Sequence, residues 1–139
     1  MKTGRLVIAG LAAGLVMNIG EAALHAGILA DAGRTAYAAL HLTAPDDPMN
    51  LVSLLALTFA QGVLMGWLYA VIRPRFGGRF TAAACAGLVV WFLSSVYAAA
   101  YLHSGFPGIL PHNLVWVPVA WQLIEYPLAM LAGAAVYGQ

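Results

Sequence analysis

Residues 6–30 read LVIAGLAAGLVMNIGEAALHAGILA, a nearly unbroken apolar stretch that is longer than the roughly 20 residues a helix needs to cross a bilayer. Three more blocks share this character, at residues 51–72, 80–102 and 114–137. Of the 139 residues, 63% are hydrophobic and 8% are charged, whereas a soluble domain carries about 25% charged residues. Such a composition leaves few polar side chains that could face water.

The four blocks predict an all-α integral membrane protein rather than a β-barrel. Lipid offers no hydrogen-bond partner to the backbone, so only helices and closed barrels span a bilayer. Barrel strands would appear as short segments of alternating polarity, which these long blocks are not. We therefore expect a single membrane domain over residues 1–139, a four-transmembrane-helix bundle with helices at about 6–30, 51–72, 80–102 and 114–137.

The basic residues predict the orientation of the chain. One side of the predicted membrane holds five of the six lysine and arginine residues, namely Lys2, Arg5, Arg73, Arg75 and Arg79. Lysine and arginine favour the cytoplasmic side, so both termini are expected to be cytoplasmic. The first apolar block exceeds the 7–15-residue core of a secretory signal peptide, which indicates that it stays in the protein as a membrane span.

The loop between the first two blocks is long and contains the segment RTAYAALHL, whose larger side chains recur at the spacing of a helix. Tyr37, Leu40 and His41 fall on one face of that segment, which is typical of a short helix lying along the membrane interface. The next connection, RPRFGGR, predicts a tight hairpin, because its paired glycines permit a sharp reversal.

Pairs of small residues four positions apart predict close helix packing. They are Gly10 and Gly14, Gly62 and Gly66, and Ala129 and Gly133. Small residues at this spacing let helix backbones approach closely in lipid. The pattern fits contacts within one chain and contacts between copies equally well.

Polar side chains inside the apolar blocks are the main candidates for function. On the first block the stripe that begins at Gly10 and Gly14 continues through Asn18, Glu21 and His25. Ionisable groups in membrane helices almost always face the interior of the bundle. The other blocks supply the remaining members of the predicted intramembrane network, which are Gln61, Ser94, Tyr97, Gln122 and Glu125. Glu125 is the expected long-range counterpart of Glu21 and His25.

Three functional interpretations are consistent with this network. The first is a structural one, in which the protein is an accessory subunit of a membrane complex or homo-oligomer. The second is a proton-coupled transporter or channel for a small molecule or ion, which uses Glu21 and Glu125. The third is a membrane subunit that binds a haem, a metal or a pigment through His25 and His103, since neutral imidazole is a common ligand for such centres.

The sequence favours the first of these interpretations and gives no support to catalysis. It contains no GxSxG, HExxH or P-loop motif, so no enzymatic activity is expected. It identifies no cofactor. The expected partners are the lipid bilayer and other membrane helices, either a second copy or a larger complex, and not nucleic acid.

The chain resembles small bacterial four-helix membrane proteins of about this length. The resemblance rests on AGLVMNIGEAALH, WLYAVIRPRFG and WQLIEYPLAMLAGAAVY. It implies a four-helix fold and a location in the bacterial inner membrane. It implies no particular chemistry, because no activity is tied to those motifs.

Overall fold

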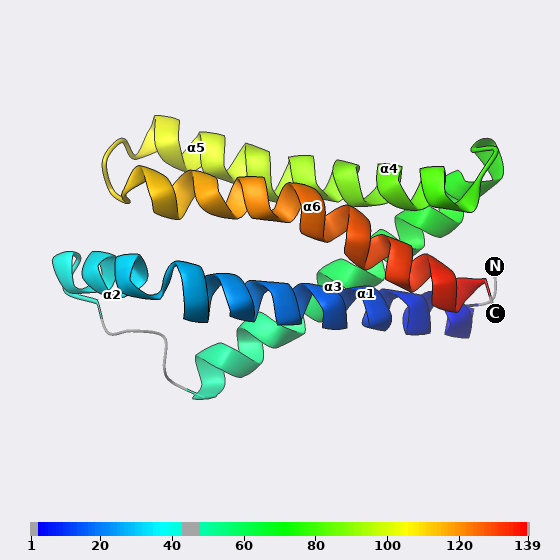
Figure 1. Ribbon diagram of the computed structural model, residues 1–139, viewed down its shortest axis with the longest axis horizontal. Helices are drawn as coiled ribbons and strands as arrows, with labels where there is room; N and C mark the ends of the chain where they lie inside the picture. The colour runs from blue at the N-terminus through cyan, green and yellow to red at the C-terminus, as the bar shows by residue number, and fades with distance from the viewer. Residues whose placement is uncertain (1–2, 43–47, 139) are drawn as a thin grey trace.

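The computed structural model describes residues 3–42 and 48–138, and every regular element in this part of the chain is helical (Figure 1). The elements are α1 (Thr3–Ala23), the π-helical turn η1 (Leu24–Ile28), α2 (Ala30–Ala39), α3 (Pro48–Ile72), the 3₁₀ turn η2 (Arg73–Arg75), α4 (Arg79–Trp91), the π-helical turn η3 (Phe92–Val96), α5 (Tyr97–Gly105) and α6 (His112–Tyr137).

Four continuous helical segments are long and apolar enough to cross a membrane. They are Thr3–Ile28, Pro48–Arg75, Arg79–Gly105 and His112–Tyr137. The prediction of four span-length helices is therefore confirmed. The first segment begins and ends slightly earlier than residues 6–30, because the chain turns after the π-helical stretch and starts α2 at Ala30.

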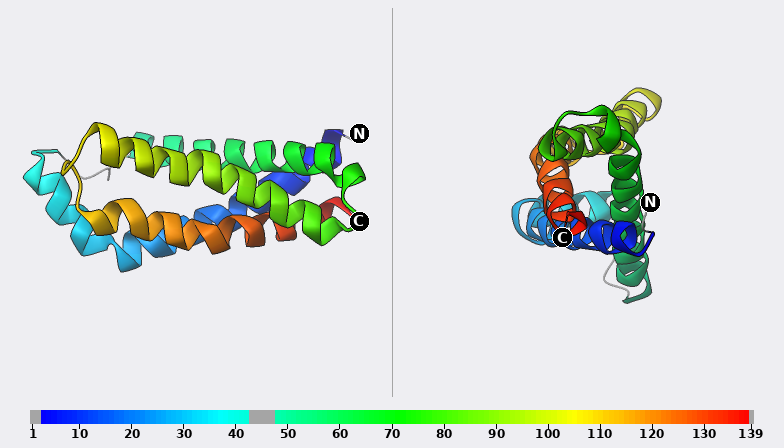
Figure 2. Two further views of the ribbon diagram at one scale, coloured as in Figure 1. Left: turned by 90° about the horizontal axis from the view of Figure 1, so that it is seen from above. Right: turned by 90° about the vertical axis from the view of Figure 1, so that its right-hand side faces the viewer.

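The four segments form an elongated bundle with both chain ends at the same end of the molecule (Figures 1 and 2). In this bundle α1 packs against α3 and α6, and α4 packs against α6. The short helix α2 lies at the opposite end (Figure 1). It contains Tyr37 and stops at Ala39, and His41 follows with a φ of 53°, so the helix is shorter than the predicted segment.

The small residues of α1 and α3 bring these two helices into backbone contact. A Cβ at Gly62 would lie 2.6 Å from the Gly14 nitrogen, and one at Gly66 would lie 3.2 Å from the Gly10 nitrogen. The helix α6 meets α1 in the same way, because a Cβ at Gly133 would lie 2.6 Å from the Ala9 carbonyl oxygen. These contacts all lie within one chain. The sequence alone was equally consistent with contacts between two copies.

A contact between α4 and α6 was not expected from sequence. A Cβ at Gly87 would lie 2.7 Å from the Cα of Pro127, so α4 approaches α6 at the proline. Nearby, the Trp91 indole Nε1 donates a hydrogen bond of 2.8 Å to the Val119 carbonyl oxygen and ties the same two helices together.

The outer surface of the bundle is almost entirely apolar. The first half of α3 turns away from the other helices (Figure 1) and exposes a run of large apolar side chains that includes Met49, Leu51, Val52, Leu54 and Leu57. A monomeric protein in water rarely exposes so much contiguous apolar surface. The exposed side chains therefore agree with helices that are long and apolar enough to cross a membrane.

Candidate functional site

A polar cluster joins α1 to α6 near the middle of the bundle. The Gln122 side-chain amide donates a hydrogen bond to Oε1 of Glu21, and the His25 Nε2 atom lies 3.1 Å from Oε2 of the same carboxyl group. Glu21 is on α1, His25 follows one turn later in η1, and Gln122 is on α6. Both oxygens of Glu21 are therefore partnered, one of them across the helix interface.

Glu125 lies one turn beyond Gln122 on α6 and is buried against α1. Glu125 is only 7% exposed. Neither of its carboxyl oxygens forms a well-aligned hydrogen bond in the protein, although the side chains of Glu21 and Trp121 lie beside the carboxyl group. The carboxyl group packs on Gly20, where a Cβ would lie 2.7 Å from the Glu125 Cδ atom. Because Gly20 directly precedes Glu21, the two glutamates lie in the same interface between α1 and α6, and we call Glu21 and Glu125 the carboxyl pair.

Two further polar groups in this region are buried without a partner. They are the indole Nε1 of Trp121, one turn before Glu125, and the hydroxyl of Ser95 in η3. More than nine in ten buried polar groups in folded proteins form a hydrogen bond, and each buried group left without one costs about 1–3 kcal/mol. Of these two groups, the Trp121 indole lies beside the Glu125 carboxyl group and Ser95 lies beside Tyr126.

A second, uncharged cluster joins α3, η3 and α6. The Gln61 side-chain amide donates to the Ser94 hydroxyl at 2.9 Å and to the Tyr126 hydroxyl at 3.3 Å. The Ser94 hydroxyl in turn donates to the Val90 carbonyl oxygen at 2.7 Å. Each of these hydrogen bonds joins two uncharged groups of the same chain, as expected of polar side chains that hold membrane helices together.

The structure thus divides the single network expected from sequence into two clusters, and it leaves two of the expected members outside both. The Asn18 amide donates to the Gly14 carbonyl oxygen of its own helix at 2.9 Å. Tyr97 is exposed and stacks on Tyr101, with ring centroids 6.4 Å apart. The side chain of His25 is 57% exposed, so it marks the rim of its cluster rather than the interior.

The two π-helical turns account for the positions of His25 and Tyr97, but not for that of Asn18, which lies within α1. A π-helical turn inserts extra backbone into an α-helix, so the residues that follow it no longer keep the 3.6-residue period. His25 lies within η1, and Tyr97 comes directly after η3. Both were assigned to the interior by assuming an uninterrupted α-helix.

The two histidines proposed as cofactor ligands belong to separate groups. His25 contacts Glu21, whereas the His103 ring lies 5.3 Å from the His112 ring and 5.9 Å from Trp116, measured between centroids. Within residues 3–42 and 48–138, no three histidine, cysteine, aspartate or glutamate side chains are placed to hold a metal ion.

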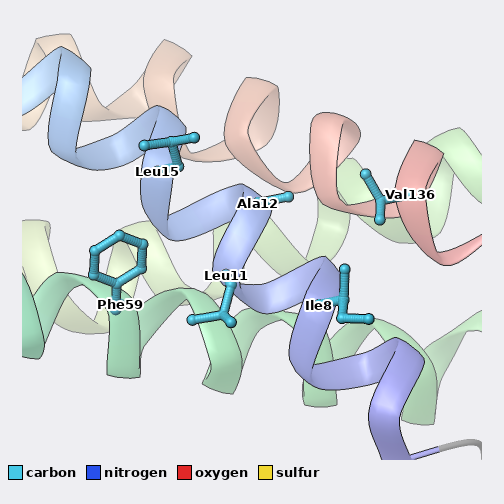
Figure 3. Close-up of a pocket in the computed structure, with 6 residues that line it drawn as sticks. All are labelled: Ile8, Leu11, Ala12, Leu15, Phe59 and Val136. Carbon is cyan, nitrogen blue, oxygen red and sulfur yellow. The ribbon is translucent and has the colours of Figure 1, made fainter.

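An apolar groove of about 490 Å³ runs along the outside of α1 (Figure 3). It is lined by Ile8, Leu11, Ala12, Leu15, Phe59 and Val136. The side chains in this groove offer no group that could donate, accept or transfer a proton. The groove therefore adds no polar group to the candidate site.

Comparison of the chain with protein-family models, with curated proteins and with solved structures found no match. The resemblance to small bacterial membrane proteins stays a prediction. Any function must therefore be argued from the geometry of the site itself.

Sequence reasoning missed four residues that shape the site, which are Gly20, Ser95, Trp121 and Tyr126. Two of them carried a readable signal. Trp121 lies four residues before Glu125 and therefore shares its helical face, and Gly20 is the residue beside the intramembrane acid. Ser95 and Tyr126 are placed by the π-helical turn η3 and by the rotation of α6, which spacing alone does not reveal.

Proposed function

We propose that the chain is an integral protein of the bacterial inner membrane with both termini in the cytoplasm. We further propose that it is a proton-coupled transporter or channel for a small molecule or ion. Glu21 and Glu125 would be its proton-binding groups. The distribution of basic residues supports the orientation, because Arg5, Arg73 and Arg79 lie at the end of the bundle that carries the termini.

The buried carboxyl group of Glu125 is the observation that carries this proposal. A polar network that only fixes helix packing is expected to satisfy its own members, because a partly satisfied network costs more than an apolar core. Glu125 instead leaves both oxygens without a well-aligned hydrogen bond, whereas the Gln61 side-chain amide donates to two hydroxyl groups. A group retained at such a cost inside a membrane helix is typically functional.

The charge balance of the site favours a proton as its ligand. No lysine or arginine occurs between residues 6 and 28, 48 and 72, 80 and 105, or 112 and 137, so two ionised glutamates would face only the imidazole of His25. Like charges that share a low-dielectric site repel strongly. Binding of a proton relieves this repulsion and needs no large ligand cavity, and reversible binding of this kind is what coupled transport requires.

Proton flux into reconstituted vesicles tests the proposal. In liposomes with an imposed membrane potential and an internal pH dye, the wild-type protein is expected to carry a flux well above that of protein-free vesicles. Glu125→Gln removes the titratable group at nearly constant volume and should reduce the flux at least tenfold. Tyr97→Phe, at an exposed position outside the cluster, is the matched control and should keep the wild-type flux.

A chemical label provides a second measurement on the same preparation. A protonated carboxyl group in an apolar setting adds to a hydrophobic carbodiimide: its oxygen bonds to the central carbon and its proton moves to nitrogen. The adduct is found by peptide mass spectrometry. We expect the adduct on Glu125 in the wild type and none at that position in Glu125→Gln. Folded wild-type protein without proton flux and without label would overturn the proposal.

The exposed first half of α3 favours a second function, that of an accessory or structural subunit. This segment leaves the bundle (Figure 1) and has large apolar side chains on all sides, so it can pack against another membrane helix. Native mass spectrometry in mild detergent is expected to find a second copy or a defined partner bound. A monomer at every detergent concentration would count against this function.

A further inference from the structure

The bundle is tightly packed at the end that carries the termini and loosely packed at the other. The backbone contacts made by Gly10, Gly14, Gly62 and Gly133 all lie between the carboxyl pair and the termini. Toward the α2 end the first half of α3 diverges from the other helices (Figure 1), and the end-on view shows it extending past α1 (Figure 2, right). The packing of the helices around the carboxyl pair therefore differs between the two ends.

Three methionines close the bundle on the termini side of the pair. Met17, Met65 and Met130 are fully buried and come from α1, α3 and α6. Met17 is one turn before Glu21 and Met130 lies just after Glu125, so each is displaced toward the termini. They belong to one buried cluster that also includes Tyr69, Tyr126 and the alanines of α4, and this cluster contains no charged group.

On the other side of the pair, polar side chains become steadily more exposed. Glu125 is 7% exposed, the Glu21 side chain is 22% exposed and the His25 side chain is 57% exposed. The His25 Nε2 atom lies 3.1 Å from the Glu21 carboxyl group, so the exposed imidazole is in contact with the partly buried acid. A neutral imidazole can accept a proton on one ring nitrogen and release one from the other, so His25 is suited to connect Glu21 with the α2 end.

We propose that in this conformation Glu21 is accessible from the α2 end alone, through His25, and that Met17, Met65 and Met130 form a closed gate toward the termini. This inference rests on the proposed proton site for its function but not for its geometry. Methionine suits a gate, because its flexible, unbranched side chain repacks easily when neighbouring helices shift. Separation of these three methionines while the α2 end closes would move access to the carboxyl pair from one side of the membrane to the other.

Thiol accessibility in sealed vesicles tests the gate without relying on transport. Cys85, the single cysteine of the chain, is first replaced in Cys85→Ser. In that background Gly4→Cys and Gly33→Cys report the two ends, since neither position has an atom within 4 Å of an added Cβ. A membrane-impermeant methanethiosulfonate reagent is then applied from each side.

We expect His25→Cys to react from the same side as Gly33→Cys and Met65→Cys to react from neither side. Reaction of Met65→Cys from the Gly4 side would overturn the gate, and so would reaction of His25→Cys from that side or from no side. If the expected pattern is found in a protein without proton flux, one-sided access stands and only the transport function fails.

A substitution in the gate supplies a functional readout. Met65→Ser is expected to raise passive proton leak in vesicles severalfold, because it shortens a fully buried side chain and adds a hydroxyl that can hydrate. Met65→Leu keeps the apolar volume and should match the wild-type leak. Equal leak through Met65→Ser and Met65→Leu in folded protein would contradict the gate.

Discussion

Replacing Gly62 with alanine is expected to lower the free energy of unfolding by about 1–3 kcal/mol, the typical cost of overpacking a well-packed site. The new Cβ would lie 2.6 Å from the Gly14 nitrogen and 2.8 Å from its Cα. These atoms belong to the backbone of α1, so no side chain can rotate out of the way. The helices α1 and α3 must separate, and the packing that holds them together in lipid weakens along their whole contact.

Unfolding in mixed micelles with increasing sodium dodecyl sulfate, followed by circular dichroism, measures this loss. Gly33→Ala on α2 is the matched control, because no atom lies within 4 Å of its added Cβ and alanine favours a helix by up to about 1 kcal/mol over glycine. The control should be as stable as the wild type or slightly more stable. Equal stability of Gly62→Ala and Gly33→Ala would contradict the close approach of α1 and α3.

Replacing Glu125 with methionine is expected to have opposite effects on stability and function. The free energy of unfolding should rise by about 1–3 kcal/mol, the cost of a buried polar group without a partner. Methionine is also an unbranched side chain of similar length, so it fills the space against Gly20. Proton flux should be lost, since the group proposed to bind the proton is removed. Stability gained at the expense of activity is a common property of functional sites.

Gln122→Met provides the contrasting variant on the same face of α6. It removes the hydrogen-bond donor to Oε1 of Glu21 and leaves that acceptor without its partner, so the protein should become less stable. Both variants are measured by the same micelle titration. If Glu125→Met proved as destabilising as Gln122→Met, Glu125 would be holding helices together, and the interpretation as an accessory subunit would gain.

This contrast separates two roles that intramembrane polar residues can have. The Gln61, Ser94 and Tyr126 cluster satisfies its hydrogen bonds within the chain and is suited to fixing the positions of helices. The Glu21 and Glu125 pair does so only in part. Proximity in one bundle does not make these two clusters a single network.

Part of the candidate site could be predicted from the sequence. Glu21, Gln122 and Glu125 stand out because ionisable and amide groups are rare in apolar spans, and their helical spacing places each set on one face. Gly20 is recognisable as the small residue beside Glu21, but its contact with Glu125 depends on which residue of α6 lies opposite. His25 and Tyr97 were assigned to the interior, since sequence does not reveal where a helix widens into a π-helical turn.

By itself the sequence determined the four span-length helices and the small-residue pairs that pack them, because both depend on properties read locally along the chain. Transfer of a segment into lipid depends on its own apolar content, and close approach depends on side chains four residues apart. The packing of Glu125 on Gly20 and the burial of Met17, Met65 and Met130 in one cluster became visible only in the folded bundle. These features depend on the rotation and crossing of whole helices, which the packing of all four fixes together.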